Sequence, residues 1–143
     1  MTADQAAARD AAAIAAGVPS MQLMRRAGLG AARALLHHLA PFHARRAVVC
    51  CGPGNNGGDG WIVAAALAEA GLSVHVREVG EARTADAAVA RAEAVRHLAL
   101  GRPDEPPDVV VDALLGTGAR GPLRGGVAEL AGYVDDARRG GAR

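Results

Sequence analysis

The pattern of apolar and polar residues predicts helices in the first part of the chain. Residues 3–16 are rich in alanine and end at Gly17, and a second helical pattern covers residues 20–39 and stops before Pro41. An apolar run follows at residues 47–51, which is too short for a helix and predicts a buried strand.

A strand–helix–strand unit starts at this run. A glycine-rich segment comes directly after it, residues 61–70 have a helical pattern that ends at Gly71, and residues 72–79 have the β-branched content of a strand. Two strands joined through a helix form a parallel pair, and such crossovers are almost always right-handed. The sequence therefore predicts an α/β fold built on a parallel sheet.

The rest of the chain continues this alternation. Residues 83–100 have a helical pattern, prolines end it, and residues 109–112 predict a third strand. Residues 125–138 predict a last helix with its apolar side chains on one face. Three strands are few for a sheet that needs cover on both faces. We therefore expect residues 1–143 to form one domain whose sheet continues in further sequence or in a partner.

Length and charge exclude several classes of protein. At 143 residues the chain fits one domain, and its net charge of +1 provides no basic surface for nucleic acid. All 16 basic residues are arginine, which excludes enzymes that depend on a Schiff-base lysine or a P-loop lysine.

The two cysteines and the hydropathy pattern indicate where in the cell the protein is located. Cys50 and Cys51 are adjacent, so they cannot form an ordinary disulfide, and no other cysteine exists to build a zinc site. The N-terminus lacks the basic and apolar blocks of a signal peptide, and no apolar run approaches the ~18–20 residues of a membrane span. These features predict a cytoplasmic protein that does not enter a membrane.

Candidate chemistry lies first in residues 52–60, between the first strand and a helix. Ligands bind at this edge of a parallel sheet, where helix N-termini point N–H donors at anions. Three of the glycines match G-x-G-x-x-G, although this match alone is weak evidence because glycine-dense loops often fit the pattern by chance. Asn55, Asn56 and Asp59 add side-chain oxygens and amides beyond what a turn requires. The alternative is a helix-capping turn in which these side chains satisfy local N–H groups.

A second candidate loop covers residues 112–122. Asp112 ends the third strand and should face the same crevice as the two asparagines. Such oxygen donors suit a monovalent or alkaline-earth cation rather than zinc, while the alternative for Asp112 is a cap on the turn behind it. Arg120 and Arg124 are the cations best placed for a phosphate, with solvated surface arginines as the alternative.

Other conspicuous residues allow simpler interpretations. The cluster of His37, His38 and His43 lies near a helix end, where histidine commonly interacts with the helix dipole, so we do not expect a metal there. Arg77 and Glu78 end the second strand, where an NAD-dependent dehydrogenase places the acid that binds ribose. A dehydrogenase that uses the glycine pattern and Glu78 is therefore one alternative function.

Three segments together carry a family likeness. They are G-V-P-S-M-Q-L-M at residues 17–24 followed by Ala27-Gly28, G-P-G-N-N-G-G-D-G at residues 52–60, and residues 112–122. In this order and spacing they resemble the YjeF N-terminal domain family, the NAD(P)H-hydrate (NAD(P)HX) epimerases. The second segment is highly specific, and the likeness runs from near residue 3 to the C-terminus.

The resemblance implies a fold and an activity. The implied fold is a Rossmann-like three-layer α/β/α sandwich with a parallel sheet and additional N-terminal helices, truncated here at the C-terminal end. The implied reaction converts the R epimer of hydrated NADH or NADPH to the S epimer, which an ATP- or ADP-dependent dehydratase, fused or separate, then repairs. A homodimer is a further expectation.

The resemblance also implies site residues. Potassium (K+) would be bound with the help of Asn56 and Asp112. The damaged dinucleotide would be bound by two sets of residues: Asn55, Asn56, Gly57, Gly58 and Asp59, and Gly116, Thr117, Gly118, Ala119, Arg120, Gly121 and Pro122.

The sequence departs from the family pattern in two places. The family continues with a strand bearing D-x-P-S-G, whose aspartate contacts the substrate and whose serine completes the potassium site, and this motif does not occur in residues 1–143. Arg25 stands where the family usually has glutamate. The catalytic group is therefore not assigned, and a non-catalytic nucleotide-binding or protein-interaction module of the same fold is the alternative.

Overall fold

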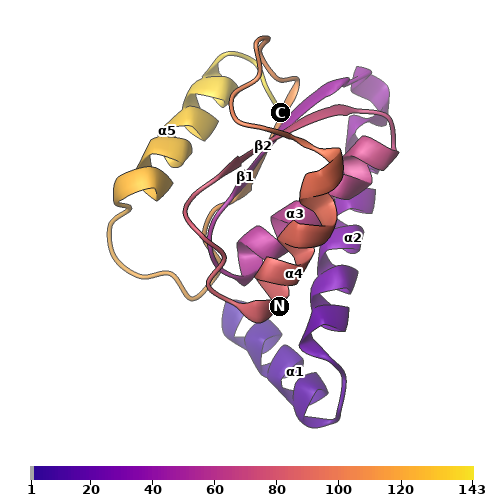
Figure 1. Ribbon diagram of the computed structural model, residues 1–143, viewed down its shortest axis with the longest axis vertical. Coiled ribbons are helices and arrows are strands. Elements are labelled where there is room, and N and C mark those ends of the chain that lie inside the picture. The colour runs from indigo at the N-terminus through magenta and orange to yellow at the C-terminus, as the bar shows by residue number, and fades with distance from the viewer. Residues whose placement is uncertain (1) are drawn as a thin grey trace.

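The computed structural model describes residues 2–143 as alternating helices and strands (Figure 1). In chain order these are α1 (Ala3–Ala15), α2 (Ser20–Leu39), the 3-10 turn η1 (Ala40–Phe42), β1 (Arg46–Cys51), α3 (Asn55–Glu69), β2 (Ser73–Glu78), α4 (Ala85–Ala94), the 3-10 turn η2 (Val95–His97), β3 (Ala99–Leu100), β4 (Val109–Ala113) and α5 (Gly125–Arg139).

A parallel sheet forms the middle layer. Its strand order is β3-β2-β1-β4, and Val49 at the centre pairs with Val76 of β2 and Val111 of β4. Helices α2, α3 and α4 lie on one face and α5 lies on the other, as Figure 1 shows. The predicted α/β/α sandwich is confirmed, and the carboxyl ends of β1, β2 and β4 meet at one edge.

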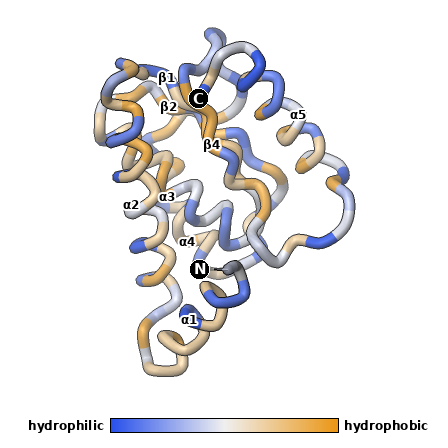
Figure 2. The backbone as a smooth tube through the Cα atoms, turned by 180° about the vertical axis from the view of Figure 1, so that it is seen from behind, coloured by the Kyte–Doolittle hydropathy of each residue, from blue (hydrophilic) through white to orange (hydrophobic). Residues whose placement is uncertain are grey.

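Small side chains let these layers pack closely. On one face Ala64 and Leu67 of α3 are fully buried against Val49, and on the other Leu130 of α5 packs with Val48. Hydrophobic colours gather along the central strands in Figure 2. No helix within residues 2–143 has the length and apolar character needed to cross a membrane.

Both cysteines belong to this core. They are free thiols with no exposed surface, in agreement with the absence of a disulfide expected from their adjacency. Burial raises the pKa of the Cys50 thiol to about 11, and burial raises that of Cys51 further. The thiols are therefore protonated and unreactive at neutral pH.

Two predicted boundaries were wrong. Helix α3 begins at Asn55 rather than at residue 61, so residues 55–60 of the predicted glycine loop are helical. The predicted helix over residues 83–100 ends at Ala94, and the short strand β3 pairs with β2 as a fourth strand. Packing overrides the low helix propensity of glycine in the first case, and two residues are too few to show a pattern in the second. Continuation of the sheet beyond these strands stays a prediction.

Candidate functional site

The two candidate loops meet at the carboxyl edge of the sheet. The Gly52 N–H donates to the Ala113 carbonyl at 2.9 Å, which extends the pairing of β1 and β4 into both loops. The Asn56 Nδ2 donates to the Leu115 carbonyl at 3.1 Å, across 59 positions of sequence. The first turn of α3 is thereby attached to the segment that follows β4.

Glycine is required here because backbone approaches backbone. A Cβ on Gly52 would overlap the Leu114 carbonyl, lying 2.7 Å from its carbon. A Cβ on Gly57 would overlap the Gly52 carbonyl in the same way, again 2.7 Å from the carbon. Gly58 lies similarly close to α2, and Gly60 lies similarly close to β4. These glycines therefore seat the first turn of α3 tightly against its neighbours, a purpose the sequence did not reveal.

The first turn of α3 has no side-chain cap. Its N-cap is Gly54, and in the part of the chain that the structure describes no side chain accepts a hydrogen bond from the first N–H groups of the helix. The side chain of Asn55 instead accepts from the Thr84 hydroxyl at 2.6 Å, while Asn56 bonds to the β4 loop. The helix-capping alternative for the two asparagines is therefore wrong. An uncapped helix N-terminus presents N–H donors and a partial positive charge to an anion.

Asp112 behaves as the turn cap considered from the sequence. One of its carboxylate oxygens accepts from the Leu114 N–H at 3.0 Å. The residue is exposed, and within residues 2–143 no arginine or histidine forms an ion pair with its carboxylate. The second oxygen thus stays available to a cation while the first holds the turn.

The chemistry of the donors fits a hard cation, such as potassium, better than a transition metal. Because the Leu115 carbonyl can only accept, the amide nitrogen of Asn56 must face it, which leaves the Asn56 oxygen as a free acceptor. Amide and carboxylate oxygens are hard ligands. Among the described residues, no three His, Cys, Asp or Glu side chains form a group that could hold a metal ion.

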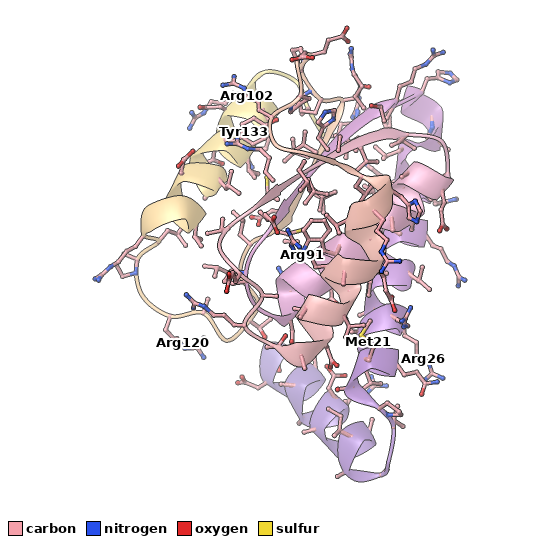
Figure 3. The ribbon with its side chains drawn as sticks, viewed as in Figure 1. Met21, Arg26, Arg91, Arg102, Arg120 and Tyr133 are labelled. Atoms are coloured by element: carbon pink, nitrogen blue, oxygen red, sulfur yellow. The ribbon has the colours of Figure 1, made fainter. Side chains whose placement is uncertain are left out.

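The loop over residues 116–122 is exposed along its whole length. The Ala119 N–H donates to the Gly116 carbonyl at 3.1 Å, which closes a turn. The Arg120 guanidinium donates to the carbonyls of Thr117 and Ala119, both at 3.0 Å, so it braces its own loop (Figure 3). Arg120 would have to release these bonds to reach a phosphate.

Asp59 faces a different part of the molecule. It lines a cavity of about 440 Å³ among α1, α2, α3 and α4 that includes Asn55 but none of residues 112–122. Burial, followed by the nearby charge of Asp10, raises the pKa of Asp59 from 3.8 to about 6. The predicted site residues of the first motif are therefore divided between two faces of α3.

This raised pKa predicts a pH-dependent cost to stability. The fold favours protonated Asp59, so the contribution of this group to stability is fully present below pH 4 and is lost as the pH rises through about 6. Asp59→Asn should stabilise the protein at pH 7.5 by about 1 kcal/mol, after allowance for solvent screening, and change little at pH 4. Urea unfolding at both pH values measures this. Asp10→Asn should lower the pKa of Asp59, and an equal effect of Asp59→Asn at both pH values would contradict the assignment.

The geometry opposes a dehydrogenase-type ribose contact. Glu78 accepts two hydrogen bonds from Arg91, at 2.6 and 2.7 Å, and the Arg91 guanidinium lies 5.5 Å from the Trp61 ring (Figure 3). Arg77 projects to the opposite face of the sheet, 4.5 Å from the ring of Tyr133. Both charged residues at the end of β2 are thus occupied by structural partners.

Two further sequence features lie away from the loops. Arg25 forms an ion pair with Glu93, in which its Nη2 donates to both carboxylate oxygens, at 2.7 and 2.9 Å. The pair lies at a groove of about 540 Å³ whose lining includes none of residues 52–60. The positive charge of Arg25, at a position where the family usually has glutamate, is therefore balanced by Glu93 of α4. His38 packs near the ring of Phe42, with 5.8 Å between ring centroids.

Thr84 is the contact that the sequence analysis missed. It is the N-cap of α4, where its hydroxyl accepts from the Ala87 N–H at 3.2 Å, and it also bonds to Asn55. A threonine directly before a helical run is a recognisable N-cap signal, but its second partner depends on the tertiary fold.

A family profile described as YjeF-related protein N-terminus matches residues 20–139. The chain belongs to this family. A bifunctional NAD(P)H-hydrate repair enzyme, Nnr, of Thermanaerovibrio acidaminovorans is 40% identical over 139 residues, covering 89% of this chain and 27% of that protein. NAD(P)H-hydrate epimerases of Rhodopirellula baltica and Rhodobacter capsulatus are 39% and 37% identical, over 79% and 87% of this chain.

A solved structure shows the same fold. The crystal structure of the yeast protein YNL200c aligns with 97% of this chain at a TM-score of 0.81 and 22% identity, and 66% of that chain is covered. The chain spans 27%, 50% and 65% of the three relatives above, so it corresponds to part of their length.

Proposed function

We propose that this chain is an NAD(P)H-hydrate epimerase domain, which interconverts the R and S forms of hydrated NADH and NADPH. The observation that carries the proposal is the uncapped first turn of α3, attached through Asn56 to the loop after β4 at the edge of the sheet where ligands bind. Relatives that share this family are named for the same reaction.

The proposed site assigns a part to each segment. The N–H groups at the start of α3 and the side chain of Asn55 would bind oxygens of the dinucleotide, and residues 116–122 would close over it. Asn56 and Asp112 would hold K+, which supplies positive charge that orients the diphosphate. Inversion at carbon 6 needs reversible loss of its hydroxyl or opening of the ring, and therefore an acid/base group.

The acid/base group is the part that residues 1–143 do not provide in the family's form, since they contain no D-x-P-S-G. The direct test compares this chain with the same chain joined to an extension that bears D-x-P-S-G. Each is incubated with R-enriched hydrated NADH in potassium buffer, and the ratio of epimers is followed. Turnover by the extended form supports the proposal, and a matched extension with alanine in place of the aspartate should abolish it.

A non-catalytic nucleotide-binding or interaction module is the second candidate, since the uncapped start of α3 can bind an anion without any acid/base group. It predicts that hydrated NADH or another partner binds while the epimer ratio stays unchanged in both forms. Some relatives are named as bifunctional repair enzymes. We therefore also propose that the chain works with an ATP- or ADP-dependent dehydratase, fused or separate. The homodimer expected from the sequence stays a prediction.

A further inference from the structure

We propose that Thr84 is a positioning residue for substrate binding, because it fixes the side-chain amide of Asn55 with its NH2 group turned toward the ligand. The inference rests on the function proposed above and adds a residue outside the family segments that the sequence analysis identified. It also assigns Asn55 and Asn56 opposite tasks, although they are adjacent and chemically identical.

The length of the hydrogen bond between Thr84 and Asn55 indicates which end of the Asn55 amide faces Thr84. The Thr84 hydroxyl already accepts from the Ala87 N–H at 3.2 Å, as the N-cap of α4. A hydroxyl can accept a second N–H, but the 2.6 Å separation is typical of an O–H···O bond and short for an N–H···O bond, so the hydroxyl hydrogen donates to the Asn55 oxygen. The Asn55 nitrogen, with two N–H donors, therefore points away from Thr84. Asn55 is exposed at the start of α3, where it also borders the cavity lined by Asp59.

Asn56 is fixed in the opposite sense. Its partner is the Leu115 carbonyl, which has no hydrogen to give, so the Asn56 nitrogen faces the protein and its oxygen faces outward. The first turn of α3 thus offers donors at Asn55 and an acceptor at Asn56. Donors suit oxygen atoms of a dinucleotide, and the acceptor suits a cation.

The arrangement also links three segments. Thr84 lies between β2 and α4, Asn55 begins α3, and Leu115 follows β4. Each asparagine is thereby oriented by a different neighbour of α3. Without its partner, either amide could rotate and present the wrong end to the ligand, since the two ends are nearly equal in size.

Variants of Thr84 separate this role from the capping of α4. Thr84→Asp retains an N-cap acceptor for Ala87, but a carboxylate can only accept, so it should turn the Asn55 NH2 group inward. We expect the Kd for hydrated NADH to rise about tenfold, with little change in Tm. Thr84→Ser keeps both hydrogen bonds and should bind as the wild type does. Isothermal titration calorimetry measures the binding and requires no turnover.

The added charge needs its own control. Ala85→Asp places a carboxylate one residue later on the exposed start of α4, without replacing the hydroxyl that contacts Asn55. If Thr84→Asp and Ala85→Asp weaken binding equally, the effect is charge repulsion and the inference is overturned. Unchanged binding in Thr84→Asp also overturns it. If the wild-type chain itself does not bind hydrated NADH, the proposed function fails instead.

NMR spectroscopy follows the side-chain amide of Asn55 directly. In the wild type the side-chain NH2 resonances of Asn55, assigned through Asn55→Asp, should shift when hydrated NADH is added. In Thr84→Asp these resonances should differ in the free protein and shift much less on titration. If the Asn55 side-chain resonances of the wild type do not shift when hydrated NADH is added, the proposed contact between Asn55 and the substrate is contradicted.

Discussion

Gly57→Ala is expected to remove a large part of the stability of the fold. The new Cβ would overlap the Gly52 carbonyl, at 2.7 Å from its carbon and 3.0 Å from the Gly52 nitrogen. These are backbone atoms held by the pairing of β1 and β4, so they cannot rotate aside as a side chain could. We expect a loss of about 4 kcal/mol or more, against a typical total of about 5–15 kcal/mol. Urea unfolding followed by circular dichroism measures it.

Gly54→Ala is the matched control from the same motif. A Cβ on Gly54 would meet no atom within 4 Å, and its φ of −92° suits any residue. We expect a change of about 1 kcal/mol or less, which reflects N-cap preference alone. If the two variants lose equal stability, close packing is not the reason for glycine at position 57.

Strands β1, β2 and β4 were predictable because each is marked by its own side chains, whereas β3 is too short to be marked in this way. The apolar run 47–51 became β1, and residues 109–112 became β4 with one residue added. Burial on both faces of a central parallel strand demands such a run, so the sequence carries the signal locally. The parallel pairing followed from the helix between β1 and β2.

The start of α3 was not predictable from local preference. Its first turns contain Gly57, Gly58 and Gly60, which in isolation favour a loop. They are helical because the glycines allow α3 to approach β1, β4 and α2 more closely than any side chain would permit. The stabilising contacts come from segments distant in sequence, so no pattern within the motif could predict them.

The candidate site was predictable in composition and not in orientation. The motif identified Asn55, Asn56 and Asp112 as polar residues at one sheet edge. It could not show that Thr84, 29 positions from Asn55, and Leu115, 59 positions from Asn56, determine how the two amides point. It also could not show that Asp59 turns toward α1, because that depends on which side of α3 the helix buries.

Asn56→Ala is expected to have the largest effect on potassium dependence. It removes the amide oxygen that we propose binds K+ and the hydrogen bond to Leu115 that orients it. The K+ concentration that gives half-maximal binding of hydrated NADH should rise on the order of 10- to 100-fold. Titration calorimetry at constant ionic strength, with choline replacing K+, measures this. Asn55→Ala is the control: it should weaken nucleotide binding and leave the K+ requirement unchanged.

Asp112→Asn separates the cation from the integrity of the loop. Asparagine at this position keeps an oxygen that can accept from the Leu114 N–H, so the turn after β4 and the Tm should be retained. It removes the negative charge that balances K+, so the K+ requirement should rise as it does in Asn56→Ala. A shared rise in both variants, with Tm unchanged in Asp112→Asn, supports one potassium site between the two loops. If the K+ requirement is unchanged in both variants, Asn56 and Asp112 join the loops but do not bind K+.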